Sequence, residues 1–98
     1  MLESVTAETF LPHEGSEFEV RDSGVPIVLR LTEVRSLGHQ AHAPRVDPFA
    51  LEFSGPSQPL LEQRIYSLAH AALGDLEIFL VPIGVDPAGG LRYEAVFN

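Results

Sequence analysis

Apolar and polar residues alternate along several short stretches of this chain, and each stretch predicts a β-strand. In residues 17–22, Phe18 and Val20 fall on one side, while acidic and basic residues fall on the other. The same period of two recurs in residues 27–34, 49–55 and 91–97. Because successive side chains of a strand point to opposite faces, this period is typical of strands with one buried face and one face in water.

Residues 63–84 form the most apolar part of the chain and allow two interpretations, one helix or two strands. A helix needs an apolar period near 3.6, and Gly74 and Asp75 interrupt it. Two strands at 65–70 and 76–82, joined by a turn at 71–75, fit the strand-forming residues better, and we favour them. The second of these is almost wholly apolar, so we expect it to be central, with both faces covered at least in part.

The remaining segments predict a short helix, tight turns and one long loop. Thr6 is expected to cap a helical turn at 7–11 that Pro12 and Gly15 close, with Val5 and Phe10 facing the core. Residues 35–48 show no period and predict a loop. The six phenylalanines are all predicted to point inward, namely Phe10, Phe18, Phe49, Phe53, Phe79 and Phe97.

Together these elements predict one all-β domain over residues 1–98. Six strands, mostly separated by turn signals, favour an antiparallel meander with one short N-terminal helix. The meander is expected either to close into a small barrel or to pack as a two-layer sandwich. If the sheet stays open, its last strand offers an edge to which another strand can add.

Charge and composition then exclude several classes of function. The chain has 98 residues and a formal net charge of −8. Such an acidic domain is a poor candidate for binding nucleic acid or an anionic membrane surface. There is no cysteine and no lysine, which excludes disulfides, thiolate metal sites, cysteine nucleophiles and Schiff-base chemistry. The first residues do not resemble a signal peptide and no apolar stretch is long enough to span a membrane, so we expect a cytoplasmic protein.

The histidines are the only side chains that invite a test for site chemistry. His39 and His42 lie three positions apart in the long loop, with Asp47 as a conceivable third ligand. A metal site needs three or four ligands. We favour the interpretation that these are solvent-exposed loop histidines. We therefore predict no metal and no cofactor. His70 ends a strand beside a turn, where we expect it to hydrogen-bond backbone groups across that turn. No Gly-x-Ser-x-Gly, P-loop or Rossmann motif occurs, and we predict no catalytic residue.

Several motifs spread over the chain resemble those of a family of small bacterial proteins classed as a domain of unknown function, DUF6916. The matching positions are Phe10, Gly15, Phe18, Gly55, Pro56, Gln63, Tyr66, Leu68, His70, Leu73, Gly74, the Phe-Leu-Val-Pro run at 79–82 and the Tyr-Glu-Ala run at 93–95. The resemblance implies no activity and no catalytic residue, and it suggests an association with phage-tail-like assemblies. The segment 35–48 has no counterpart in the family pattern.

The family pattern also contains a polar set, Gln63, Tyr66, His70 and Glu94. Our preferred hypothesis is that these four form a buried hydrogen-bonded network that fixes strand register. The alternative is that they line a small site.

Two hypotheses of function follow. The first is a non-enzymatic protein-interaction or structural module that acts through a protein partner or by self-association. The second is a small-ligand-binding protein or enzyme built around Gln63, Tyr66, His70 and Glu94, which requires those side chains to converge on a pocket. The lack of catalytic motifs favours the first.

Overall fold

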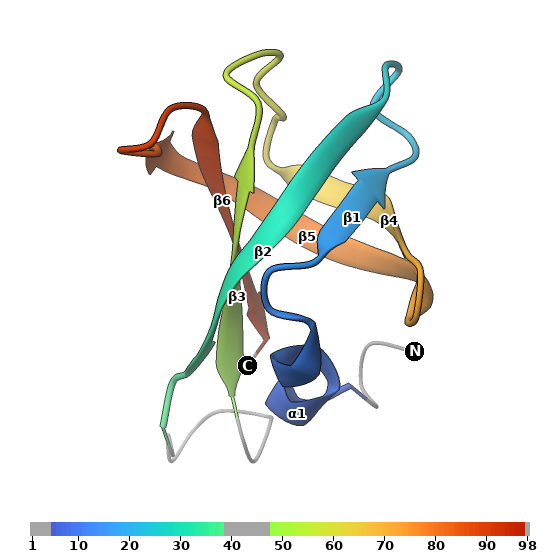
Figure 1. The fold of residues 1–98 in the computed structure, drawn as a ribbon, viewed down its shortest axis with the longest axis vertical. Helices are drawn as coiled ribbons and strands as arrows, with labels where there is room; N and C mark the ends of the chain where they lie inside the picture. The colour runs from blue at the N-terminus through green and yellow to red at the C-terminus, as the bar shows by residue number, and fades with distance from the viewer. Residues whose placement is uncertain (1–4, 39–47, 98) are drawn as a thin grey trace.

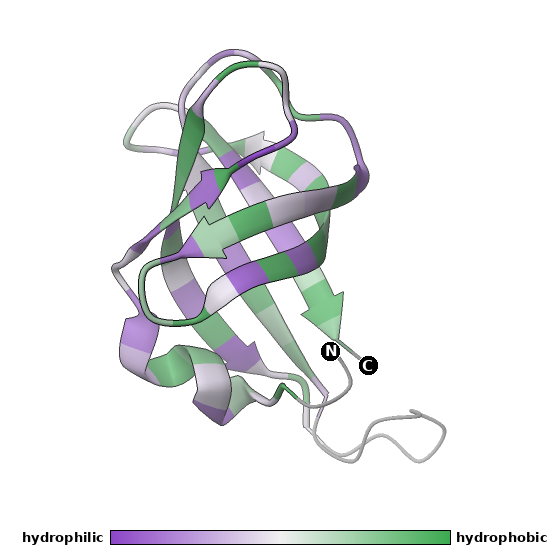
Figure 2. Cartoon of the chain, turned by 90° about the vertical axis from the view of Figure 1, so that its right-hand side faces the viewer, coloured by the Kyte–Doolittle hydropathy of each residue, from purple (hydrophilic) through white to green (hydrophobic). Residues whose placement is uncertain are grey.

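Alternating burial along six strands closes the chain into an antiparallel barrel (Figure 1). This computed structural model describes residues 5–38 and 48–97. The strands are β1 (Glu17–Val20), β2 (Ile27–Ser36), β3 (Phe49–Gly55), β4 (Arg64–His70), β5 (Gly74–Val85) and β6 (Leu91–Phe97). Figure 2 shows hydrophobic and hydrophilic positions alternating along the strands, as the sequence pattern predicts. The all-β prediction and the barrel alternative are therefore confirmed, and the sandwich is not formed.

The strands do not follow one meander. Their order around the barrel is β1-β2-β3-β6-β5-β4, and β4 returns to pair with β1. Two three-stranded meanders are thus joined, and the chain between β3 and β4 crosses the end of the barrel that is uppermost in Figure 1. The sheet does not stay open, so the edge expected in that case at the last strand is absent: β6 pairs with β3 on one side and with β5 on the other. A closed barrel has no edge strand for a partner to extend.

Strands β2 and β5 are longer than the sequence predicts, and each changes its partner along its length. β2 pairs first with β1 and then with β3, whereas β5 pairs first with β4 and then with β6. The register of each shifts once, between Leu31 and Glu33 in β2 and between Pro82 and Gly84 in β5. Such irregularities bend a strand and increase its twist, which helps a small sheet to close. Arg35 and Ser36 accordingly belong to β2 and not to the predicted loop.

Helix α1 (Ala7–Phe10) and the 3-10 turn η2 (Leu11–His13) lie at the lower end of the barrel in Figure 1. Thr6 is the N-cap as predicted, and the hydroxyl oxygen of Thr9 accepts its backbone N–H at 3.0 Å. The helical segment continues through Pro12 and ends at His13, before Gly15. Pro12 lies within η2, where its missing N–H costs nothing. None of the helices in the described ranges is long and apolar enough to span a membrane.

Aromatic side chains fill the barrel and its lower end. The rings of Phe49 and Phe97 stack with centroids 4.6 Å apart, and Phe10 reaches both at 6.0 Å. Five of the six phenylalanines are buried as predicted. Phe79 is the exception. It points outward on β5 and is 45% exposed, so the outer face of that strand is only partly covered.

Candidate functional site

The four predicted site residues lie in separate places. Gln63 is exposed just before β4, Tyr66 is the third residue of that strand, and His70 is its last residue. Four residues of extended chain separate Tyr66 from His70 by about 13 Å. Glu94 lies on the outer side of β6, between the inward-facing Tyr93 and Ala95. No hydrogen bond or ion pair in the described ranges joins any two of the four, so the structure does not bring them together.

His70 closes the turn between β4 and β5. Its Nδ1 accepts the backbone N–H groups of Ala72 at 3.0 Å and Leu73 at 3.1 Å. The expectation that His70 bonds backbone groups across the turn is therefore confirmed. Its other ring nitrogen, Nε2, lies 2.9 Å from the hydroxyl oxygen of Ser16, a residue that no sequence pattern singles out.

These contacts fix the tautomer of His70. Since Nδ1 accepts two hydrogen bonds, the ring proton resides on Nε2 and is donated to Ser16 Oγ. The Ser16 hydroxyl in turn donates to the carbonyl of His13 at 2.5 Å. A serine nucleophile needs the opposite polarity, in which the histidine accepts the hydroxyl proton. The Ser16–His70 pair is thus oriented for structure and not for nucleophilic catalysis.

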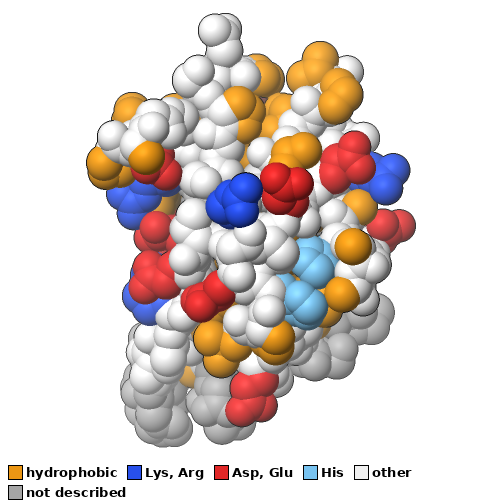
Figure 3. Space-filling view, viewed as in Figure 1, with side chains coloured by type: hydrophobic (Ala, Val, Ile, Leu, Met, Phe, Trp, Pro, Cys, Tyr) orange, Lys and Arg blue, Asp and Glu red, His pale blue; other side chains and the backbone are white. Residues whose placement is uncertain are grey.

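The surroundings of His70 disfavour its charged form. It is 8% exposed, its ring lies 4.5 Å from that of Phe18, and the ring of His13 meets it edge-on at 4.7 Å. The two described histidines appear side by side in pale blue in Figure 3. Burial, with a smaller contribution from His13, lowers the pKa of His70 below its ordinary value.

Tyr66 helps to close the upper end of the barrel. Its hydroxyl donates to the carbonyl of Glu62 at 2.7 Å, and the guanidinium of Arg64 lies 4.0 Å above its ring. Burial raises the pKa of Tyr66, and the charge of Arg64 opposes the rise. Nearby, the hydroxyl of Tyr93 accepts the backbone N–H of Leu61 at 3.0 Å. Both tyrosines anchor the crossing chain before β4.

Glu94 belongs to a ladder of ion pairs on the outer face of β2, β3 and β6. Arg35 binds Glu94 at 2.7 Å and Glu52 at 3.3 Å, and Arg92 binds the other oxygen of Glu52 at 2.9 Å. The Glu52 side chain is only 14% exposed, so these contacts are better shielded than ordinary surface pairs. The carboxylate of Glu94 therefore contributes to strand pairing on this face.

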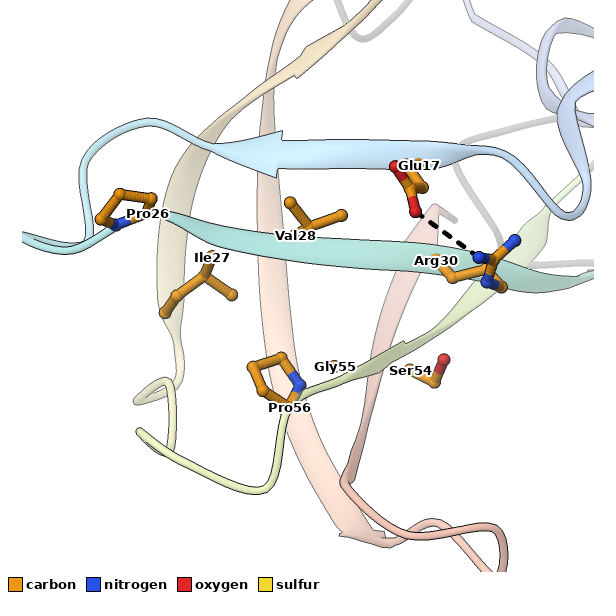
Figure 4. A pocket seen from close by; sticks show the side chains of 8 residues that line it. All are labelled: Glu17, Pro26, Ile27, Val28, Arg30, Ser54, Gly55 and Pro56. Atoms are coloured by element: carbon orange, nitrogen blue, oxygen red, sulfur yellow. Dashed lines mark hydrogen bonds and ion pairs between the residues drawn. The ribbon is translucent and has the colours of Figure 1, made fainter.

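A groove of about 430 Å³ opens between β2 and the end of β3 (Figure 4). The ladder between the two strands ends at Arg30 and Ser54. The next residue across from Val28 is Pro56, which has no N–H to donate, so the strands separate. An exposed ion pair of Glu17 and Arg30, 3.5 Å apart, borders the groove. Pro26 and Pro56 have no N–H groups to donate, so this local gap between β2 and β3 is poorly suited to pairing with another strand.

The described residues contain neither unpaired buried polar side-chain atoms nor a group of metal-binding side chains. None of their buried side-chain nitrogen or oxygen atoms lacks a hydrogen-bond partner. Within the same ranges, no three acidic or histidine side chains are grouped so as to hold a metal ion. His39, His42 and Asp47, the conceivable ligands noted in the sequence, lie outside the described residues.

The outer face of β4 and β5 carries an unusual pair of side chains. Ile65 and Phe79 are partners in register, and they are 56% and 45% exposed. We call them the outer apolar pair. Among the register pairs of the described strands, only in this pair are both members large, apolar and exposed. The prediction that Phe79 lies in the core is therefore wrong. Its neighbours Ile78 and Leu80 are buried, so Phe79 between them points to the outer face of the strand.

A comparison with family models identifies the chain. The model described as "Domain of unknown function (DUF6916)" matches residues 5–97, so the chain belongs to this family and the resemblance seen in the sequence is confirmed. Comparisons with curated proteins and with solved structures gave no match. The family description names no activity.

Proposed function

We propose that this DUF6916 domain is a non-enzymatic protein-interaction module that binds its partner through the outer face of β4 and β5. The outer apolar pair is the observation that carries this proposal. Single exposed apolar side chains are normal on a protein surface and need no explanation. An exposed phenylalanine directly across from an exposed isoleucine forms a joint apolar surface, which is the kind of surface that a partner covers.

The use of the polar side chains supports the same proposal. The ring nitrogens of His70 and the hydroxyls of Ser16, Tyr66 and Tyr93 all have partners within the barrel. The groups most capable of chemistry are therefore engaged in closing turns and ends. The alternative of a ligand site or active site built from Gln63, Tyr66, His70 and Glu94 has no comparable support, because these residues do not converge.

Affinity capture from host lysate, read by quantitative mass spectrometry, tests the proposal. The wild-type domain is compared with Phe79→Ser, which removes half of the outer apolar pair without disturbing the core. Val28→Ser is the matched control, because Val28 is a similarly exposed apolar residue on the outer face of β2. We expect a partner that is recovered with the wild type and with Val28→Ser but lost with Phe79→Ser.

Equal recovery with Phe79→Ser would contradict the proposed surface, and recovery of no protein above background would contradict the proposed function. Thermal unfolding of all three proteins keeps the comparison valid. Substitutions on this outer face are expected to leave the fold intact.

A further inference from the structure

We infer that the partner presents a basic side chain next to an apolar one, so that it is a basic protein surface and not a second copy of this chain. This inference rests on the proposed function, because it concerns the same face of β4 and β5. Its basis is the distribution of charge around the outer apolar pair.

Two carboxylates precede Phe79 on the same face of β5. Asp75 and Glu77 lie four and two positions before Phe79, and all three residues are exposed. Since side chains two apart on a strand share a face at a spacing of about 7 Å, acidic groups form one border of the apolar pair. A partner that covers Phe79 therefore brings its neighbouring residues over these carboxylates.

The residues across from the two carboxylates are small. Ser67 is the partner of Glu77 in register, and Ala69 is the partner of Asp75. No long side chain of β4 therefore stands directly across from either carboxylate. The face consists of an apolar part, Ile65 and Phe79, beside an acidic part, Asp75 and Glu77. An apolar side chain of the partner fits against the first, and a lysine or arginine fits over the second.

No arginine in the described part of the chain forms an ion pair with Asp75 or Glu77. Each described arginine has an ion-pair partner elsewhere, and these partners are Glu19 for Arg21, Glu17 for Arg30, Glu33, Glu52 and Glu94 for Arg35, Asp22 for Arg64 and Glu52 for Arg92. Arg21 comes nearest in register, since its backbone N–H donates to the carbonyl of Ser67. Its side chain nevertheless pairs with Glu19 at 3.4 Å.

The same charges disfavour self-association through this face. A two-fold dimer places one copy of the surface against another, which would bring the Asp75 and Glu77 carboxylates of both copies into one interface. Each chain also carries a formal net charge of −8. Like charges across an interface oppose binding, whereas a basic partner gains both affinity and a faster encounter.

The test is selection from a random 12-residue peptide library displayed on phage, with the immobilised wild-type domain as bait. We expect the enriched peptides to combine lysine or arginine with a large apolar residue. Individual synthetic peptides are then titrated against Phe79→Ser and against the double variant Asp75→Asn/Glu77→Gln. Val28→Ser and Glu8→Gln serve as matched controls for the loss of an apolar group and of a charge.

Binding should fall about tenfold or more with Phe79→Ser, as for the loss of a central contact residue. It should fall severalfold with the double variant, and the wild-type affinity should decrease with added salt, while the controls bind as the wild type does. Enriched peptides that need Phe79 but carry no basic residue would overturn this inference and leave the proposed function standing. Peptides indifferent to Phe79, or no enrichment at all, would count against both.

Sedimentation velocity of the unliganded domain provides the complementary result. We expect a monomer at low salt. A dimer at low salt that Phe79→Ser dissociates would identify a second copy as the occupant and overturn the inference.

Discussion

The His70 end of β4 and the outer face of the same strand make opposite use of their side chains. At the His70 end, two backbone N–H groups, a ring, a hydroxyl and a carbonyl are joined in one continuous set of hydrogen bonds. On the outer face, Ile65 and Phe79 remain largely uncovered. The histidine, which is the side chain most capable of chemistry, is thus committed to the fold. The phenylalanine that was expected in the core is available for binding.

This contrast separates two structural signs of function, a buried polar group without a hydrogen-bond partner and an exposed apolar surface. A buried polar group without a partner would indicate a missing ligand, and the described residues contain none. An exposed apolar pair beside carboxylates without ion pairs is instead the kind of surface that the proposed partner would cover. On the proposed function, the domain is a binding surface supported by a filled barrel.

The largest expected effect comes from Phe18→Ala. Phe18 is fully buried, and its ring meets that of Phe53 edge-on at 5.4 Å. Removing a buried ring should lower the free energy of unfolding by about 3–5 kcal/mol. Urea unfolding measures the change, and Phe79→Ala provides the same substitution on the opposite face of the barrel wall. Similar losses for the two variants would mean that Phe79 is part of the core after all.

The next effect in size is that of His70→Ala. It leaves the N–H groups of Ala72 and Leu73 without their acceptor, which should cost about 2–3 kcal/mol. His70→Asn is the matched variant, because its side-chain oxygen can accept from the same groups, and it should restore a large part of the loss. Hydrogen exchange at Ala72 and Leu73 reports the turn directly. Unchanged exchange in His70→Ala would contradict the assigned role.

A smaller effect follows from pH. The pKa of His70 in the folded state is lowered, so the unfolded state binds its proton more readily. The contribution of this group to stability is therefore complete above the ordinary histidine pKa of about 6.5 and declines as the pH falls below that value. Urea unfolding between about pH 7 and pH 5 should show the decline. His70→Asn should flatten it, whereas an equally steep decline in that variant would assign the effect to other groups.

The smallest change in stability is expected for Phe79→Ser. An outward side chain on a barrel strand contributes little to the fold, so the free energy of unfolding should change by no more than about 0.5 kcal/mol. Partner capture should nevertheless be lost. A variant that is markedly less stable and also fails to bind would remove the separation between fold and binding on which the comparison depends.

Local pattern is sufficient to predict most of the fold. Alternation alone predicts that Phe18, Val20 and Phe53 point inward, because each is flanked by polar residues, and all three are buried. The run at 76–81 has no such contrast beyond its first residues, so its inner and outer faces look alike. Burial of Ile78 and Leu80 and exposure of Phe79 are decided by closure of the barrel, which depends on pairing between distant strands.

The candidate site could be predicted less well for a related reason. The bonds of His70 to its own turn could be expected, because they need only neighbouring residues. Its contact with Ser16 joins positions 54 residues apart, and the sequence contains no signal for it. Glu94 and His70 both belong to the polar set of the family pattern. They are nevertheless separated, because strand alternation sends one outward and the other inward.

Site-specific photo-crosslinking in living cells tests the central claim most directly. A photoreactive phenylalanine analogue replaces Ile65 in one protein and Val28 in another, and both are exposed apolar positions on strands. We expect a discrete crosslinked protein from position 65, weakened by adding Phe79→Ser, and none from position 28. Crosslinking from position 28 alone, or none from position 65 in cells that retain the partner, would contradict the claim that the outer apolar pair binds a partner.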